Sequence, residues 1–335
     1  MIYLSSLNMM FYFTLMLGTF LTLSSSSWFN AWVGLELNLL SFIPLILSKN
    51  NKYSSEAALK YFLIQALGSS FIIFTSSILF FSSFFPLIMI CSSLILKLGA
   101  APFHFWLPQI MEGLNWLQLI ILMTIQKLAP LFLLNYLMNF NFIIYIILFS
   151  SMLSAFIGAI LGMNQTSLRK MMAFSSINHM AWMLTAMIIS ENILLFYFLF
   201  YCVISSSVAL LFYYEQIYYL NHLMNLTNNS TSSKMILFMS MLSLGGLPPF
   251  SGFMPKWILI QEMMNFKLFI PLIILLISTL ITLYFYLRIT IFSFLFSSSK
   301  MKQSLMLNKY MMIMIYIFLF MNMFSLLIPS SMIFF

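Results

Sequence analysis

The chain has 335 residues, of which 63% are hydrophobic and 6% are charged. Soluble domains carry about a quarter of their residues as Asp, Glu, Lys or Arg, so these numbers exclude a water-soluble globule, and they also exclude a disordered chain. The net charge of +8 comes from basic residues that stand singly or in pairs, which excludes a nucleic-acid-binding patch. The class that remains is a membrane protein.

The apolar residues form long continuous runs, whereas the strands of a membrane β-barrel alternate with a period of two. A membrane-spanning helix needs about 20 such residues. We therefore expect an all-α polytopic membrane protein of about eleven transmembrane helices, forming one integral domain over residues 1–335. In chain order the expected spans cover residues 5–24, 28–48, 56–81, 84–101, 115–138, 141–162, 167–189, 193–214, 235–264, 269–296 and 308–333.

The loop charges predict the orientation of these spans. The loops after spans 2, 6, 8 and 10 contain eight basic residues, and the loops after spans 1, 3, 5, 7 and 9 contain one, Lys267. The eight are Lys49, Lys52, Arg169, Lys170, Lys234, Lys300, Lys302 and Lys309. Since basic loops face the electrically negative compartment, we expect the N-terminus on the inner side and the C-terminus on the outer side.

Five ionisable residues fall deep inside expected spans, where a charge costs several kcal/mol and normally faces protein or water. They are Glu36, Lys97, Lys127, His179 and Lys256. The lysines outnumber the single carboxylate, so they cannot all be paired. A lysine without a carboxylate partner at that depth either lies in water or loses its proton for part of the time, and such an amine can pass protons on.

Structural readings of these residues stay open beside the relay reading. Lys60 and Arg288 lie nearer the inner ends of their spans, where a long side chain can reach the interface. His179 is either a relay group or a hydrogen-bonded packing residue. Glu36 and Lys97 are also compatible with a static buried ion pair.

The span at residues 235–264 cannot be one regular helix, because Gly245–Phe253 contains two adjacent prolines and three glycines. Free carbonyls at membrane depth are tolerated only where they meet protein or water. A broken helix beside an ionisable residue, here Lys256, is a common ion-site arrangement in transporters. Pro130, three residues after Lys127, is a weaker sign of the same kind.

The connection over residues 100–113 is aromatic and bounded by prolines, so we expect it to lie along the membrane interface. Its His104 and Glu112 are candidates for either a structural anchor or a catalytic role. The chain contains no dinucleotide-binding or phosphate-binding glycine motif, and its two cysteines provide no ligand set for a metal or cluster. We therefore expect no redox centre on this chain.

Several strings resemble the proton-conducting, antiporter-like subunits of respiratory complex I, in the shortened animal form that lacks the first three of fourteen spans. The strings are Trp32–Glu36, Glu56–Phe62, Lys97–Pro108, Ser167–His179 and Leu247–Phe250. The abundance of Met, Phe, Ile and Asn suits the AT-rich mitochondrial genome of an insect. The resemblance implies an antiporter-like fold with discontinuous helices.

The resemblance also implies roles for individual residues. Glu36 and Lys97 would form the central ion pair, Lys127 would be the central relay lysine and Lys256 the lysine of the outer half-channel. Lys60 matches a further lysine of the family. The chain would be a subunit of a proton-translocating NADH:ubiquinone reductase in the mitochondrial inner membrane.

On this reading NAD, FMN, iron–sulfur clusters and ubiquinone are bound by other subunits. The expected partners are other membrane-arm subunits, neighbouring antiporter-like subunits among them, and inner-membrane phospholipids. Two alternatives stay open: a stand-alone or multisubunit sodium/proton antiporter, and a structural subunit that conducts no protons.

Overall fold

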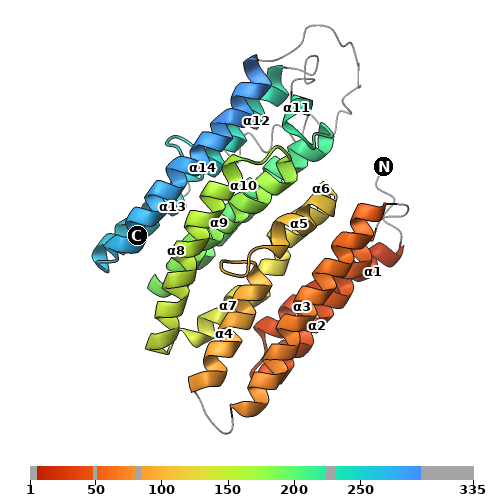
Figure 1. Cartoon of the computed structure of the whole chain (residues 1–335), viewed down its shortest axis with the longest axis vertical. Coiled ribbons are helices and arrows are strands. Elements are labelled where there is room, and N and C mark those ends of the chain that lie inside the picture. Colours follow the sequence, from red (N-terminus) through yellow and green to blue (C-terminus); the bar gives the residue numbers. More distant parts are fainter. Residues whose placement is uncertain (1–5, 48–50, 80–83, 224–230, 296–335) are drawn as a thin grey trace. The chain divides into compact units, whose positions relative to one another are not determined.

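The computed structural model describes residues 6–47, 51–79, 84–223 and 231–295 (Figure 1). Within these residues every regular element is a helix. Eight helical stretches are long and apolar enough to cross a membrane, and two shorter helices are also apolar. The prediction of an all-α polytopic membrane protein is confirmed, and the expected span 308–333 lies outside the described residues.

The chain divides into two compact units, with the boundary inside α8. The first unit, Met1–Ser154, contains seven helices and the start of α8: α1 Ser6–Leu23, α2 Trp28–Ile46, α3 Lys52–Ile78, α4 Phe84–Leu98, α5 Trp106–Gly113, α6 Trp116–Met123, α7 Ile125–Leu137 and α8 Asn141–Met163. The second unit, Ala155–Phe335, contains the rest of α8 and, among its described residues, α9 Leu168–Ile189, α10 Glu191–Tyr214, α11 Leu220–Leu223, α12 Thr231–Gly245, α13 Phe253–Asn265 and α14 Phe269–Leu295. The expectation of a single domain stays a prediction.

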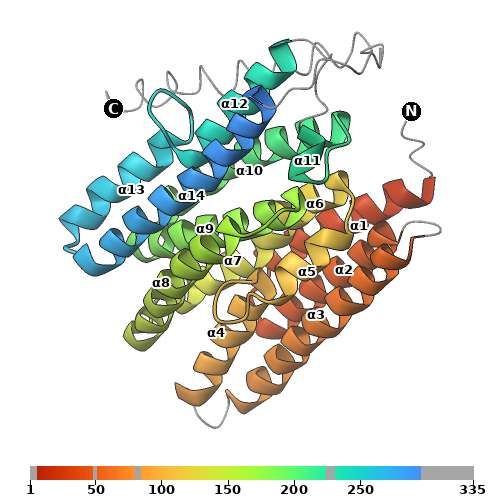
Figure 2. The ribbon, with the colours of Figure 1, turned by 45° about the horizontal axis from the view of Figure 1, so that its top comes forward.

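In the first unit α1, α2 and α3 lie side by side (Figures 1 and 2). The contact between α1 and α2 is close because it is made at glycines. A Cβ atom on Gly34 would lie 2.8 Å from the carbonyl oxygen of Gly18, a distance that real side chains do not adopt. Small residues therefore set the position of the helix that carries Glu36.

The second unit is organised around α9, which is the most buried of the long helices. Asn178 of α9 accepts a hydrogen bond of 3.1 Å from Ser278 and donates one of 3.5 Å to Thr282, both on α14. A Cβ on Gly158 of α8 would lie 2.9 Å from the backbone of Asn178. These contacts hold polar side chains inside a mostly apolar helix bundle, and His179 is the next residue along α9.

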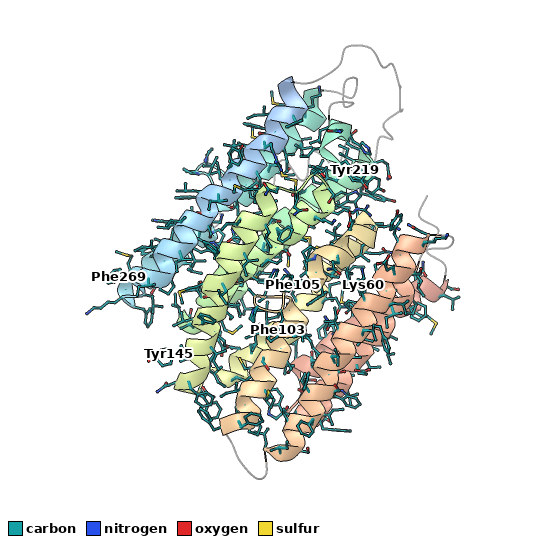
Figure 3. The ribbon with its side chains drawn as sticks, viewed as in Figure 1. Lys60, Phe103, Phe105, Tyr145, Tyr219 and Phe269 are labelled. Atoms are coloured by element: carbon teal, nitrogen blue, oxygen red, sulfur yellow. The ribbon has the colours of Figure 1, made fainter. Side chains whose placement is uncertain are left out.

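Large apolar side chains cover the outward faces of both units. Tyr145 on α8 and Phe269 at the start of α14 are among them, and both are drawn in Figure 3. Because little polar surface interrupts these faces, each unit presents to its surroundings the kind of surface that lipid solvates.

Two expected spans are broken rather than continuous. Residues 235–264 form α12 and α13 on either side of a turn, as predicted. Residues 115–138 form α6 and α7, separated at Thr124, whose φ and ψ are −111° and −80°. The sequence pointed to Pro130 as the weak point of this span. The break instead lies six residues earlier, at Thr124, and α7 continues through Pro130.

The connection after α4 contains a short helix, α5, and its expected place along the membrane interface stays a prediction. α5 buries most of its side chains and packs against α3. It therefore forms part of the core of the first unit.

Candidate functional site

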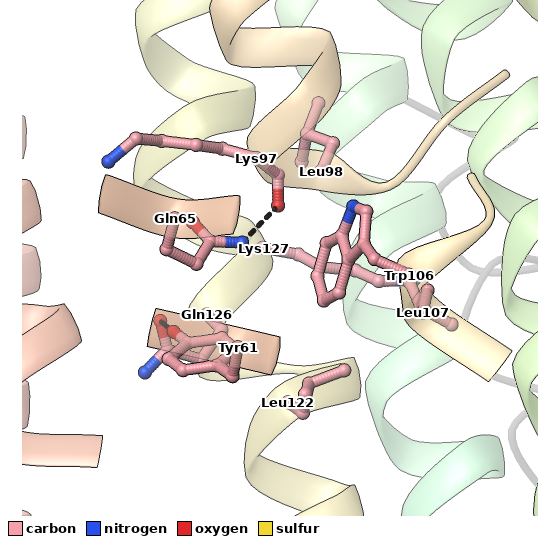
Figure 4. Close-up of a pocket in the computed structure, with 9 residues that line it drawn as sticks. All are labelled: Tyr61, Gln65, Lys97, Leu98, Trp106, Leu107, Leu122, Gln126 and Lys127. Atoms are coloured by element: carbon pink, nitrogen blue, oxygen red, sulfur yellow. Dashed lines mark hydrogen bonds between the residues drawn. The ribbon is translucent and has the colours of Figure 1, made fainter. Parts of the chain in front are cut away.

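Two of the predicted lysines, Lys97 and Lys127, line one cavity in the first unit (Figure 4). Both side chains are buried, with Lys97 in the last turn of α4 and Lys127 in the first turn of α7. The space open to water in this cavity is about 10 Å³. That volume is close to what one buried water molecule needs. The two residues thus border a site the size of a single water, and the Lys97 side chain extends from it in the direction opposite to that of Lys127 (Figure 4).

The polar groups around this cavity come from amide and hydroxyl side chains. Gln65 donates a hydrogen bond of 3.3 Å to the Lys97 carbonyl, and Tyr61 donates one of 3.2 Å to Oε1 of Gln126. Nε2 of Gln126 is buried and has no hydrogen-bond partner among the described residues. A buried amide donor costs about 1–3 kcal/mol if it stays unsatisfied, so a water in the cavity is the natural acceptor.

The side chain of Lys97 lies against a glycine of α3. A Cβ atom on Gly68 would lie 3.1 Å from Cγ and 3.2 Å from Cε of Lys97. Trp106 of α5 donates a 3.0 Å hydrogen bond to the carbonyl of Leu96. The end of α4 is therefore held on both sides, and the lysine has room because position 68 carries no side chain.

The break at Thr124 determines where Lys127 begins its helix. The Thr124 hydroxyl donates to the Ile120 carbonyl at 2.7 Å, which closes α6. The Lys127 N–H then donates to the Thr124 carbonyl at 3.1 Å, which opens α7. Pro130 has no N–H, so the carbonyl four residues earlier, on Gln126, lacks its helical donor. The Gln126 carbonyl, directly before Lys127 in the chain, is thus available to accept a hydrogen bond from water.

Glu36 and Lys97 do not form a direct ion pair among the described residues. Oε2 of Glu36 is buried without a hydrogen-bond partner in the described residues. The indole N–H of Trp32, one turn earlier on α2, is also buried without one. The unpaired carboxylate oxygen of Glu36 thus lies one helical turn from the unpaired N–H donor of Trp32. A small movement of either side chain would change whether the two form a hydrogen bond.

Lys256 in the second unit binds the broken end of α12. Its ammonium nitrogen donates to the carbonyls of Gly245 at 2.8 Å and Leu244 at 3.3 Å. The carbonyl end of a helix carries partial negative charge, which suits a cation. Gly246, at φ +76°, lies beside this side chain, and a Cβ there would lie 2.7 Å from Cδ of Lys256. The glycine therefore makes room for the lysine and provides the left-handed turn.

His179 belongs to an aromatic cluster in the same unit. Its Nδ1 lies 3.0 Å from the Tyr197 hydroxyl, and its ring lies 5.2 Å from the ring of Tyr201. Trp182, one turn further along α9, stacks on Tyr197 and lies 6.0 Å below the Lys256 ammonium. His179 and Lys256 are therefore connected through two aromatic side chains.

Lys60 lies apart from both clusters. It pairs with Glu56 at 2.6 Å, one turn earlier on α3, and the side chains of Lys60 and Glu56 are 40% and 60% exposed (Figure 3). An exposed pair at this spacing contributes only about 0.3–0.5 kcal/mol. The structure thus places Lys60 on an outer face and not around the cavity of Lys97 and Lys127.

His104, between α4 and α5, is buried, and its Nδ1 lies 3.2 Å from the Pro102 carbonyl. Burial lowers the pKa of the His104 imidazole below its ordinary value. A neutral ring that donates from Nδ1 leaves Nε2 as an acceptor, and Nε2 has no partner among the described residues. The anchor and catalytic readings of this residue both stay open.

Comparisons with known proteins identify the family of this chain. The family model for the transmembrane region of NADH:quinone oxidoreductase and Mrp antiporters matches residues 25–84 and 81–282. This chain belongs to that family. NADH-ubiquinone oxidoreductase chain 2 from Anopheles gambiae is 46% identical over 302 residues, 88% of this chain and 87% of the relative. The protein of the same description from Aedes aegypti is 46% identical over 329 residues, 96% and 95% of the two chains.

A solved structure supports the fold of this chain. A chain of respiratory complex I from Thermus thermophilus superposes with a TM-score of 0.86, covering 97% of this chain and 79% of that chain at 22% identity. At this low identity the similarity concerns the arrangement of helices. The resemblance read from the sequence motifs is therefore confirmed at the level of family and fold.

Three residues of the candidate site were missed in the sequence. Gln65 and Gln126 are amides inside long apolar spans, and attention to neutral polar residues at membrane depth would have found them. Tyr197 carried no signal, since it is one of 16 tyrosines. Its role is visible only from its 3.0 Å contact with His179.

Proposed function

We propose that this chain is a membrane-arm subunit of respiratory complex I and contributes to proton translocation coupled to electron transfer from NADH to ubiquinone. The observation that carries the proposal is the pair of buried lysines, Lys97 and Lys127, which both line one water-sized cavity. Its relatives in two mosquitoes are described as chain 2 of NADH-ubiquinone oxidoreductase, which supports the same assignment.

The proposal includes a place and a set of partners. The chain lies in the mitochondrial inner membrane, with its N-terminus in the matrix and its C-terminus in the intermembrane space, as the loop charges favour. Other membrane-arm subunits, including antiporter-like ones, are its neighbours, together with inner-membrane phospholipids. This chain carries no redox centre, and NAD, FMN, iron–sulfur clusters and ubiquinone bind elsewhere in the complex.

The proposed step in the first unit is electrostatic. A change in charge elsewhere in the membrane arm moves Glu36 toward or away from Lys97, and this alters the proton affinity of Lys97 and then of Lys127. Moving one unit charge from about 4 to about 8 Å at an effective dielectric constant of about 20 changes a pair energy by roughly 2 kcal/mol. That change alters a proton-binding constant by more than tenfold, which is enough to direct a transfer.

The second unit would receive and release the proton at Lys256. When protonated, its nitrogen has three N–H donors, and the carbonyls of Leu244 and Gly245 accept two of them. The third is available to water or to the face of Trp182. His179 and Tyr197 provide a hydroxyl–imidazole contact through which a proton can also pass.

The test is proton pumping in the assembled complex carrying Lys97→Ala. We expect NADH oxidation to continue while the number of protons pumped per electron falls, because the amine that senses Glu36 is gone. Lys52→Ala is the matched control, since Lys52 is an exposed lysine at the start of α3. If pumping per electron is unchanged in Lys97→Ala, the chain is a structural subunit and the proposal is wrong.

The family description also includes Mrp antiporters, so a second candidate function is sodium/proton exchange outside a redox complex. The two candidates differ in what accompanies the chain. Purification of the native complex with redox subunits and NADH-dependent proton pumping supports the first. A chain found only with other antiporter subunits, with sodium-dependent proton flux, supports the second.

A further inference from the structure

A second and larger cavity of the first unit has no part in the proposed relay. Its volume is about 640 Å³. It lies where helices of this unit begin and end, and its wall includes Leu23 at the end of α1, Trp28 at the start of α2, Leu79 just after α3 and Leu137 at the end of α7. Because membrane-crossing helices end at the bilayer surface, the cavity opens at the level of the lipid headgroups.

The lining changes character with depth. Ser24, Ser25, Ser26 and Ser27 are at the mouth, in the turn between α1 and α2. Ala31, Leu87, Leu133 and Leu137 form the inner wall, and all four are buried. Leu133 lies four residues before the end of α7, which places the inner wall roughly 6 Å below the helix ends. The cavity therefore has a hydroxyl-lined entrance and an apolar interior.

The hydroxyls at the mouth keep hydrogen-bonding capacity for a ligand. The Ser27 oxygen accepts from the N–H of Asn30 at 3.4 Å, so its own O–H is left to donate. Ser25 donates to the Thr22 carbonyl at 2.8 Å, so its oxygen is left to accept. Trp28 and Tyr136 are also in the lining, and these residue types favour the interface between headgroups and acyl chains.

Charge limits the class of ligand. The lining contains no Asp, Glu, Lys, Arg or His. The two described connections at this end, residues 24–27 and 138–140, have no basic residue either. An anionic headgroup would find no cationic side chain here to pair with. The ester and choline groups of a zwitterionic phospholipid need no such cation at the serine turn.

We propose that this cavity binds a glycerophospholipid with a zwitterionic headgroup. One acyl chain enters between Leu87 and Leu133, and the glycerol esters accept hydrogen bonds at the serine turn. The site is separate from the cavity of Lys97 and Lys127, so it adds a lipid-binding role to the proposed function and does not depend on it.

The test uses the assembled complex in nanodiscs that contain phosphatidylcholine with a diazirine near the ester end of one acyl chain. After irradiation, mass spectrometry of digested chain is expected to place cross-links on residues 24–31 and 133–137. Leu133→Trp, which fills the inner wall, is expected to remove most of this labelling. Leu199→Trp is the control, because Leu199 lies on an exposed face of α10.

The labelling pattern can also overturn the proposal. Cross-links spread over exposed helix faces, with none concentrated at the serine turn, would show that only bulk lipid is present. Unchanged labelling of the turn in Leu133→Trp would mean that the cavity is not the binding site. Stronger protection by unlabelled cardiolipin or ubiquinone than by phosphatidylcholine would assign a different ligand. If Leu133→Trp does not assemble, the wild-type cross-link map decides alone. None of these readouts depends on proton pumping.

Discussion

Trp32 and Glu36 leave a donor and an acceptor unused on α2, one turn apart. Residues at this spacing are neighbours on a helix surface. In the proposed mechanism the charge of Lys97 attracts the carboxylate, and a hydrogen bond from the indole would hold it in another position. Trp32 is thus a positioning residue for a two-position carboxylate, in the mechanism proposed above.

Replacing Trp32 by Phe removes the indole N–H and keeps an aromatic ring. A hydrogen bond to a charged group contributes about 1.5–3 kcal/mol, so losing the position that the indole would hold is expected to lower pumping per electron while the complex still assembles. Infrared difference spectra should show a shifted carboxyl band for Glu36, which a purely structural defect would not produce. Trp257→Phe on α13 is the control, and an equal loss in both variants would contradict the role.

Gly68 provides the second prediction at this scale, because its missing side chain is the space that Lys97 occupies. We expect Gly68→Val to displace the lysine and lower proton pumping, with a smaller effect for Gly68→Ala, since a single methyl would lie 3.1 Å from a flexible chain. Ser70→Val, on the exposed side of the same helix, should pump normally. Normal pumping in Gly68→Val would show that Lys97 does not need this position.

At the scale of elements, both candidate clusters are built at helix breaks. Thr124 separates α6 from α7 just before Lys127, and Gly246–Gly252 separates α12 from α13 just before Lys256. Broken helices expose carbonyls that regular helices use internally. At the end of α12 the exposed carbonyls bind the ammonium of Lys256 directly. In α7 the carbonyl of Gln126, which lacks its helical donor because of Pro130, immediately precedes Lys127.

Replacing Gly246 by Ala tests the break in the second unit. The left-handed conformation at φ +76° costs roughly 1–2 kcal/mol for Ala, and the new methyl would collide with the Lys256 side chain. We expect lower thermal stability of the complex and reduced pumping. In Gly245→Ala the methyl meets its nearest neighbour at 3.7 Å, so this variant should behave like wild type. Equal behaviour of the two variants would exclude a special role for Gly246.

At the scale of the whole molecule, the sequence predicts a relay that uses amines from both units. If Lys97 and Lys256 act in series, losing either one already stops the transfer. The double variant Lys97→Ala/Lys256→Ala should then lose no more pumping than the more severe single variant, since effects of groups acting as a unit are not additive. Pumping stoichiometry in reconstituted vesicles measures this. Additive losses would indicate two independent paths.

Much of the fold could be predicted from the sequence because the bilayer imposes a simple rule on long apolar runs. The expected spans 5–24, 28–48 and 141–162 agree with α1, α2 and α8 to within a few residues. The break at residues 245–253 was also predictable, since prolines and glycines cannot continue a helix. These features depend on local chemistry alone.

The break at Thr124 and the aromatic environment of His179 could not be predicted. Nothing in the string around Thr124 excludes a helix, and His179 is contacted by Tyr197 and Tyr201 from another helix. The place of Lys60 in the relay stays a prediction. The ion pair described for this residue, with Glu56, joins positions i and i+4 of one helix.

The glycine contact between α1 and α2 has a mechanical consequence. At Gly18 and Gly34 the two helices approach so closely that the side chains of Asn38 and Thr22 fill the space where a Cβ atom would lie. Sliding one helix past the other would cause a steric clash, so α1 and α2 move as one rigid body. Any displacement of the Glu36 backbone must therefore move α1 as well. The lipid or protein around α1 would then oppose or favour each such displacement.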